Sequence, residues 1–190
     1  MSRLFKLYFI SLCSVLLSNV IFAQEVAMEP LRAAADIDIE RYMGTWYEIA
    51  RLPNWFQKKC AGDVTAAYTL QDNGTILVVN RCRKAGGQMV QAEGLAKQAN
   101  MNGPNTKLKV RFAPAFLSFL PFVWGNYWII DLAPDYRYAV IGEPDRKYLW
   151  ILSRSPAMDE ITLQTVLDKV REQGYDLTDL IRTEQSDESR

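Results

Sequence analysis

Lys107-Leu108-Lys109-Val110-Arg111-Phe112 is the stretch that decides the fold, because charged and apolar side chains alternate along it without interruption. Successive side chains of a β-strand point to opposite faces of the sheet, so this strand would have one charged face and one apolar face. Strict alternation is typical of a strand that lies between solvent and a core. We therefore predict a β-strand over residues 107–112.

The same period of two recurs on both sides of this stretch. It predicts eight strands, at residues 45–51, 64–70, 75–81, 88–98, 107–112, 127–132, 136–141 and 147–152. Short polar connections separate them, among them Gln71-Asp72-Asn73-Gly74, which is a strong hairpin turn. Short connections favour an antiparallel up-and-down order, and eight such strands can close into a barrel that holds one small ligand. The predicted fold class is thus all-β, an eight-stranded up-and-down antiparallel β-barrel.

The period changes from two to that of a helix near the C-terminus. Between residues 159 and 173 the apolar positions share one helical face: Leu163, Val166, Leu167 and Val170. Asp159 stands at the expected start of this helix and Gly174 at its end. We predict one α-helix packed on the outside of the sheet, followed by a short final strand within residues 175–181.

Composition excludes several classes of function. The 190 residues carry 22 Lys and Arg against 22 Asp and Glu, and this zero net charge argues against a nucleic-acid surface. The sequence has no histidine, which excludes Ser-His-Asp and Cys-His catalysis and removes the commonest zinc ligand. An apolar fraction of 49% argues against disorder. We expect one globular domain with no metal and no cofactor.

The N-terminus has the order of a secretory signal peptide. Basic Arg3 and Lys6 precede an apolar run over residues 7–17, and the small Ala23 follows at a suitable cleavage position. This predicts export, with a mature chain that starts near Gln24. An uncleaved membrane anchor is the alternative, although the run is short for a span of about 20 residues.

Lipid anchoring is a second alternative, because Cys13 could be acylated. Leu12 precedes it where a lipobox needs a small residue, so we expect no anchor there. The predicted organisation is a signal peptide over residues 1–23, an N-terminal linker over 24–35, one domain over 36–183 and a polar tail over 184–190.

Two cysteines remain in the mature chain, Cys60 and Cys82. An even count in an exported protein favours one disulfide, and the hairpin turn at residues 72–74 brings the two positions close enough for it. Two separate buried thiols are the alternative.

Three segments carry a resemblance to a known family. Gly44-Thr45-Trp46-Tyr47-Glu48-Ile49-Ala50-Arg51 resembles the opening motif of the lipocalins, and residues 38–43 fit the helical turn that precedes it. Residues 133–140 and 145–154 are similar to the second and third lipocalin regions. The pattern is most similar to that of the bacterial outer-membrane lipocalins, a group akin to apolipoprotein D, and covers residues 36–181.

The resemblance implies roles for individual residues. In lipocalins the tryptophan closes one end of the barrel and an arginine lies against its ring, which here would be Trp46 and Arg154. Such a cation–π contact contributes about 0.5–2 kcal/mol. The family motif is therefore expected to have a structural role, in Gly44, Trp46, Asp135, Tyr136 and Arg154.

The resemblance also implies a function, since a lipocalin barrel is an apolar cup that suits a hydrophobic ligand. Bacterial members bind fatty acids and lysophospholipids, so the implied function is lipid storage or transport for membrane maintenance under stress. The implied location is the periplasm or the periplasmic face of the outer membrane. Alternation gives two faces of each strand but does not tell which is inside. The candidate cavity residues are Val64, Tyr68, Leu108, Val110, Phe112, Trp128 and Ile130.

Two apolar connections are expected at the open end of the cup, at residues 52–56 and 112–124. Their large side chains are Trp55, Phe56, Phe116, Leu117, Phe119, Leu120, Phe122 and Trp124. Together they would form an apolar patch suited to a membrane surface. A lid folded over the cavity and a homodimer contact are the alternatives.

Other classes of function remain as rivals. An isomerase-type enzyme acting on a hydrophobic ligand would need a poised acid or base inside the cup, for which Glu48 and Asp131 are the strand carboxylates. A haem or metal carrier is disfavoured by the absence of histidine. A purely structural envelope protein is the third rival.

Overall fold

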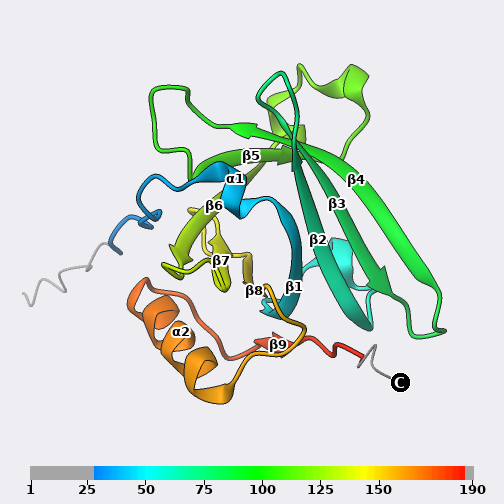
Figure 1. Ribbon diagram of the computed structural model, residues 1–190, viewed down its shortest axis with the longest axis vertical. Coiled ribbons are helices and arrows are strands. Elements are labelled where there is room, and N and C mark those ends of the chain that lie inside the picture. The colour runs from blue at the N-terminus through cyan, green and yellow to red at the C-terminus, as the bar shows by residue number, and fades with distance from the viewer. Residues whose placement is uncertain (1–27, 187–190) are drawn as a thin grey trace, which may run out of the picture.

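Nine strands form one antiparallel sheet in the computed structural model, which describes residues 28–186. The strands are β1 (Gly44–Arg51), β2 (Gly62–Leu70), β3 (Ile76–Arg83), β4 (Met89–Gln98), β5 (Lys107–Arg111), β6 (Gly125–Leu132), β7 (Tyr138–Gly142), β8 (Leu149–Ser153) and β9 (Ile181–Arg182). Neighbours in sequence pair from β1 to β8, and β1 also pairs with β8, so the sheet closes on itself (Figure 1). The predicted eight-stranded up-and-down barrel is confirmed.

The helical elements are short except for one. They are α1 (Ile39–Tyr42), α2 (Glu160–Glu172) and the 3-10 turns η1 (Trp55–Gln57), η2 (Ala115–Leu117) and η3 (Pro121–Val123). Asp159 begins α2 by accepting a hydrogen bond from the backbone N–H of Thr162 at 2.8 Å, and α2 ends before Gly174, which has a positive φ of 83°.

The final strand differs from the expected one. Only Ile181 and Arg182 pair with β1, whereas residues 175–180 are not a strand. Tyr175 is instead buried against the barrel, where its hydroxyl accepts from the backbone N–H of Glu143 at 3.1 Å. Asp176 then accepts from Thr178 N–H, which holds a local turn in place of extended backbone.

The barrel wall has an apolar core on each face. On the outer face, β8 contributes Leu149 and Ile151 to a cluster with the buried residues of α2. On the inner face, Leu152 joins a second cluster with Trp46, and Trp150 packs against it. Figure 1 shows α2 lying across one side of the barrel. One core is therefore completed by the helix, and the other lies inside the barrel.

Trp46 and Arg154 close one end of the barrel. Trp46 is fully buried, and its indole N–H donates to the carbonyl of Tyr42 at 2.9 Å. The guanidinium of Arg154 lies 3.8 Å from the Trp46 ring centroid and donates to three backbone carbonyls, those of Arg41, Tyr42 and Thr45. Gly44 has a φ of 92°, and a Cβ there would lie 3.3 Å from Arg154 Nη1, which explains the glycine of the motif.

Two other motif residues lie at the same end. The Tyr136 hydroxyl accepts from Asp38 N–H at 2.8 Å, and the Arg41 guanidinium lies 4.0 Å from its ring centroid. Asp135 accepts from the backbone N–H of Arg137 in the turn before β7. The Tyr136 contacts join the turn before β7 to α1 and the residue that precedes it.

Chain segments outside the expected domain also pack on the barrel. Leu31, in the expected linker, is buried in the outer cluster. Gln185, in the expected polar tail, donates through Nε2 to the carbonyls of Glu48 and Val64 at 2.8 and 2.9 Å. It therefore bridges β1 and β2 beyond the point where their own pairing ends. The expected signal peptide and Cys13 lie outside the described residues.

The disulfide between Cys60 and Cys82 is present, with a Cα–Cα distance of 5.5 Å. It ties the connection between β1 and β2 to the end of β3. The alternative of two separate thiols does not describe this structure.

We expect the Trp46→Ala substitution to destabilise the protein by about 3–5 kcal/mol, because it removes a fully buried indole and leaves a cavity. Arg154→Ala should cost less, about 1–3 kcal/mol, because it removes a cation–π contact and hydrogen bonds to backbone carbonyls but leaves the indole in place. Urea denaturation followed by circular dichroism measures both. Trp55→Ala, which removes an exposed indole, is the control and should change stability by less than about 0.5 kcal/mol. Equal stability of Trp46→Ala and this control would contradict the structural role.

Candidate functional site

The closed half of the barrel interior is filled by aromatic side chains. Tyr127 lies between two other tyrosines, and its hydroxyl is 2.8 Å from those of Tyr42 and Tyr68. Burial raises the pKa of Tyr68 to about 12 and that of Tyr127 well above its ordinary value, so these phenols stay neutral and share a chain of hydrogen bonds. These tyrosines fill the closed half of the interior, and we call them the aromatic floor of the barrel.

The open half is lined by smaller side chains. Residues that lie directly opposite one another on neighbouring strands share a face of the sheet. Ala66 pairs with Asn80, and Asn80 pairs with Ala92, so these three side chains lie side by side on the inner face. Gly94 belongs to the same inner face, and a Cβ there would lie 2.7 Å from the ring of Phe112. Ala92 is exposed although it lies on the inner face, and Ala66 is only partly buried. Solvent therefore reaches both of these inner positions.

A charged pair lies inside this apolar barrel. The pairing of β1 with β8 shifts between Glu48 and Ala50, and this bulge places both Glu48 and Arg51 on the inner face. Arg51 Nη1 donates to Glu48 Oε1 at 3.3 Å, and both side chains are buried. Burial raises the pKa of the Glu48 carboxyl, while hydrogen bonds from Thr183 and Gln57 and the charge of Arg51 lower it.

Side chains of η1 and β8 complete the surroundings of this pair. Gln57 Nε2 donates to Glu48 Oε2 at 2.7 Å, and its Oε1 accepts from the Trp150 indole N–H at 2.8 Å. The Phe56 ring lies 6.2 Å from that of Trp150 and 5.6 Å from that of Tyr148. The connection between β1 and β2 thereby packs over one side of the interior.

Most of the predicted cavity residues lie on the inner face. Tyr68 and Leu108 belong to the inner cluster, and Val110 packs against it. Val64 and Phe112 are each two residues from a position on that face. The structure corrects the other two, since Trp128 and Ile130 lie in or against the outer cluster below α2. Tyr127 and Ile129 occupy the inner positions of β6 instead.

The two strand carboxylates are not brought together. Asp131 lies outside the barrel, where it accepts from Lys169 Nζ at 3.0 Å and from the Tyr138 hydroxyl at 3.2 Å. Glu48 lies inside and accepts from Thr183, Arg51 and Gln57. Among residues 28–186, no three Cys, Asp or Glu side chains lie close enough together to hold a metal ion.

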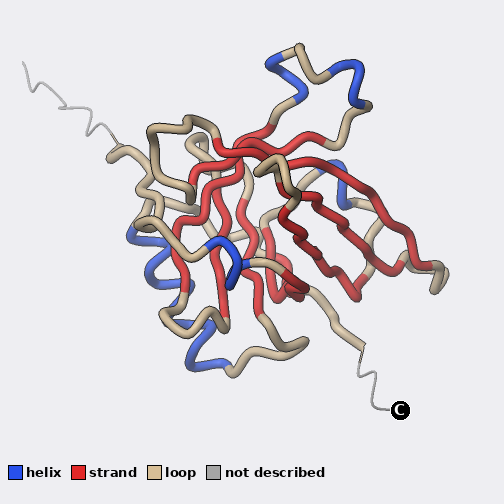
Figure 2. Tube along the Cα trace, turned by 45° about the horizontal axis from the view of Figure 1, so that its top comes forward, coloured by secondary structure: helices blue, strands red, loops and turns tan. Residues whose placement is uncertain are grey.

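The apolar connection between β5 and β6 projects away from the barrel. In Figure 2 its two short helical turns stand beyond the ends of the strands at the top. Phe116, Phe119 and Phe122 are 74%, 77% and 80% exposed, while Leu117 and Leu120 are partly buried.

Trp124, at the end of this connection, folds back onto the barrel wall. Its ring centroid lies 4.3 Å from Lys97 Nζ, and its indole N–H donates to the carbonyl of Ser118 at 2.8 Å. In the first apolar connection, Trp55 is 73% exposed. The side chains of Phe116, Phe119 and Phe122 therefore face solvent in this structure.

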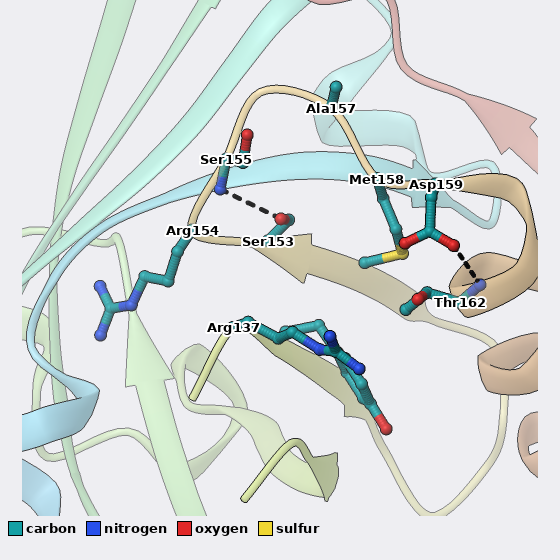
Figure 3. Close-up of a pocket in the computed structure, with 9 residues that line it drawn as sticks. Arg137, Ser153, Arg154, Ser155, Ala157, Met158, Asp159 and Thr162 are labelled. Carbon is teal, nitrogen blue, oxygen red and sulfur yellow. Dashed lines mark hydrogen bonds between the residues drawn. The ribbon is translucent and has the colours of Figure 1, made fainter. Parts of the chain in front are cut away.

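A surface pocket of about 250 Å³ lies outside the barrel, between the end of β8 and the start of α2 (Figure 3). Its lining is Arg137, Tyr138, Ser153, Arg154, Ser155, Ala157, Met158, Asp159 and Thr162. Its polar groups largely partner one another, since Ser155 N–H donates to Ser153 Oγ and Thr162 N–H to Asp159. The pocket lies on the outer face of the wall, whereas Glu48 and Arg51 lie on the inner face.

Sequence reasoning missed Arg51 and Gln57 as residues of the interior. Unbroken alternation would put Arg51 on the outer face, and the bulge before it turns its side chain to the inner face. Gln57 lies in the connection between β1 and β2, where no strand period applies. The hydrogen-bonding side chains at residues 48, 51, 54 and 57 do not follow the strand period of two on which the sequence prediction rests.

No helix within residues 28–186 has the length and apolar character needed to span a bilayer.

Comparison with known proteins identifies relatives over most of the chain. The lipocalin-like domain family matches residues 37–185. Temperature-induced lipocalin-1 of Arabidopsis thaliana is 46% identical over 80% of this chain and 81% of its own. The outer membrane lipoprotein Blc of Escherichia coli K12 is 39% identical over 79% of this chain and 80% of its own. Insecticyanin of the tobacco hornworm Manduca sexta shares the fold, with a TM-score of 0.60 at 23% identity over 83% and 85% of the two chains.

Proposed function

This chain belongs to the lipocalin family, and from that premise we propose that it binds a hydrophobic small molecule inside the open half of its barrel. One observation carries the proposal: small and apolar side chains on the inner face, among them Ala92 and Val110, remain accessible although they face a core. The outer face of β6, β7 and β8, by contrast, is covered by α2. Among the described residues, no such element covers the inner positions around Ala92.

The energy of burial favours a long apolar chain as the ligand. Removing one methylene from water contributes about 0.8 kcal/mol, so a long acyl chain supplies roughly 10 kcal/mol before association costs are subtracted. We propose a fatty acid or a lysophospholipid as the natural ligand, and storage or transport as the role. The inner tyrosines give the end of such a chain an aromatic floor.

We place this role in the cell envelope of a bacterium, for membrane maintenance under stress. The signal-peptide order of residues 1–23 supports export, and the bridge between Cys60 and Cys82 suits an oxidising compartment. A relative named an outer membrane lipoprotein supports the same location. We expect a protein that is not anchored through Cys13.

Lipid analysis tests the proposal directly. Protein purified from its own envelope without denaturation is examined by native mass spectrometry and then extracted with organic solvent. We expect one molar equivalent of a single-chain lipid, and delipidated protein should rebind it. The control is the same protein unfolded and washed before analysis, which should carry none. Protein that carries no lipid and binds none after delipidation would contradict the proposal.

The exposed phenylalanines suggest where the lipid is received. Phe116, Phe119 and Phe122 all lie in the connection between β5 and β6, and each is about three quarters exposed. Burying one large apolar side chain contributes about 1.5–3 kcal/mol, so three are sufficient for reversible contact with a bilayer. We propose that this connection contacts a membrane surface.

We expect Phe116→Ser/Phe119→Ser/Phe122→Ser to abolish co-sedimentation with phosphatidylcholine vesicles, with nearly unchanged affinity for soluble ligand. Because the mature chain, without Arg3 and Lys6, has only a small excess of acidic residues, the binding of the unmodified protein should depend little on salt. The control is Met101→Ser/Ile161→Ser, which removes two exposed apolar side chains elsewhere. Lost ligand affinity with unchanged sedimentation would indicate a lid. A dimer that becomes a monomer would indicate a homodimer contact.

A further inference from the structure

The bulge in β1 brings a cation, Arg51, into the barrel interior, where Glu48 is the charged side chain that contacts it. Arg51 pairs with Trp150 of β8, and Trp150 pairs in turn with Ile141 of the inner cluster. Directly opposite residues share a face, so the Arg51 side chain belongs to the interior. Its exposed fraction is only 9%. A guanidinium is costly to bury unless its N–H groups find acceptors.

The hydrogen bonds around Arg51 are unequally distributed. The Glu48 carboxylate has three donors, from Thr183, Gln57 and Arg51 itself. Arg51 has five N–H donors, of which one, on Nη1, reaches Glu48 at 3.3 Å. Within the described residues its Nε is buried without any partner. The cation is thus the under-satisfied member of the pair.

The position of Arg51 suits the head of a bound amphiphile. It is the last residue of β1, where the chain leaves the barrel wall for the connection that carries η1. Trp150 lies beside it and, with Phe56 and Tyr148, forms an aromatic wall. The inner cluster that contains Tyr68 and Leu108 continues from there toward the closed end. A lipid with its tail among those residues has its head group near Arg51.

We propose that Arg51 binds the oxyanion head group of a single-chain lipid inside the barrel and so selects anionic over neutral amphiphiles. A guanidinium matches both a carboxylate and a phosphate, because its planar N–H groups can donate in pairs. The inference rests on the proposed lipid-binding function and names the residue that reads the head group.

The test compares ligands that differ only in their heads. Oleate, oleyl alcohol and 1-oleoyl lysophosphatidate are titrated into the full mature protein with its disulfide intact, and binding is followed by calorimetry. We expect both anions to bind at least about tenfold more tightly than the alcohol, since a hydrogen bond to a charged group has this effect on affinity. Arg51→Met should remove the difference and leave the affinity for the alcohol unchanged. Arg51→Lys should keep part of it.

Two further variants keep the test decisive. Glu48→Gln/Arg51→Met removes both charges, so no unpaired carboxylate remains to disturb folding, and it should also fail to prefer the anions. Arg81→Met is the matched control, because Arg81 lies on the exposed outer face of β3 and should leave the preference intact.

The outcomes separate this inference from the proposed function. If neither oleate nor the alcohol binds the unmodified protein, the proposed function fails. If both bind and the folded Arg51 variants keep the same preference as the unmodified protein, the function stands and the inference is overturned. Preference for oleate alone identifies a carboxylate head, and preference for lysophosphatidate alone identifies a phosphate. Either preference supports the role of Arg51, provided that the Arg51 variants lose that preference.

Discussion

Arg154 holds the closed end of the barrel together by joining three parts of the chain. Its guanidinium covers the ring of Trp46 and donates to carbonyls of α1 and of the start of β1, while its own backbone follows β8. The first and last strands of the barrel and the helical turn that crosses its end are thereby fixed to one another. With this end closed by the chain's own side chains, the opposite end is the one through which a ligand can enter.

The two faces of the barrel wall differ in what covers them. At β8 both faces are apolar, with Leu149 and Ile151 buried outside and Leu152 buried inside. The helix α2 covers the outer face on this side of the barrel (Figure 1). The inner face is filled by tyrosines at its floor, but toward the mouth it is lined by alanine, glycine and an asparagine. The side chains of Ala66 and Ala92 are short enough to leave these inner positions within reach of solvent, and this is where the proposed ligand would lie.

Alternation and turn chemistry were sufficient to predict the fold. All eight barrel strands were predicted to within two residues, because strands such as residues 107–111 keep a strict period of two between clear turns. The final strand was misplaced because Tyr175, an apolar residue in a short segment, is buried by packing rather than by pairing. The local sequence pattern is the same whether an apolar side chain is buried in a strand or by packing of a loop against the barrel.

The site was less predictable for a physical reason. A period of two defines two faces but not which one is inside, so Trp128 and Ile130 were assigned to the cavity although Tyr127 and Ile129 face it. Bulges add to this difficulty. The one in β1 turns Glu48 and Arg51, three positions apart, to the same side, whereas unbroken alternation would separate them. The charged pair could be found only from the register of the strands.

The central claim is that the lipid lies inside the open half of the barrel, and a nuclear magnetic resonance titration tests it most directly. Uniformly ¹⁵N-labelled protein is titrated with oleate, and the shifts of the backbone amides are mapped onto the strands. The account predicts saturable shifts at inner positions such as Ala66 and Ala92, with small shifts along α2. Shifts confined to the outer pocket around Ser155 and Thr162, with none at the inner positions, would contradict it.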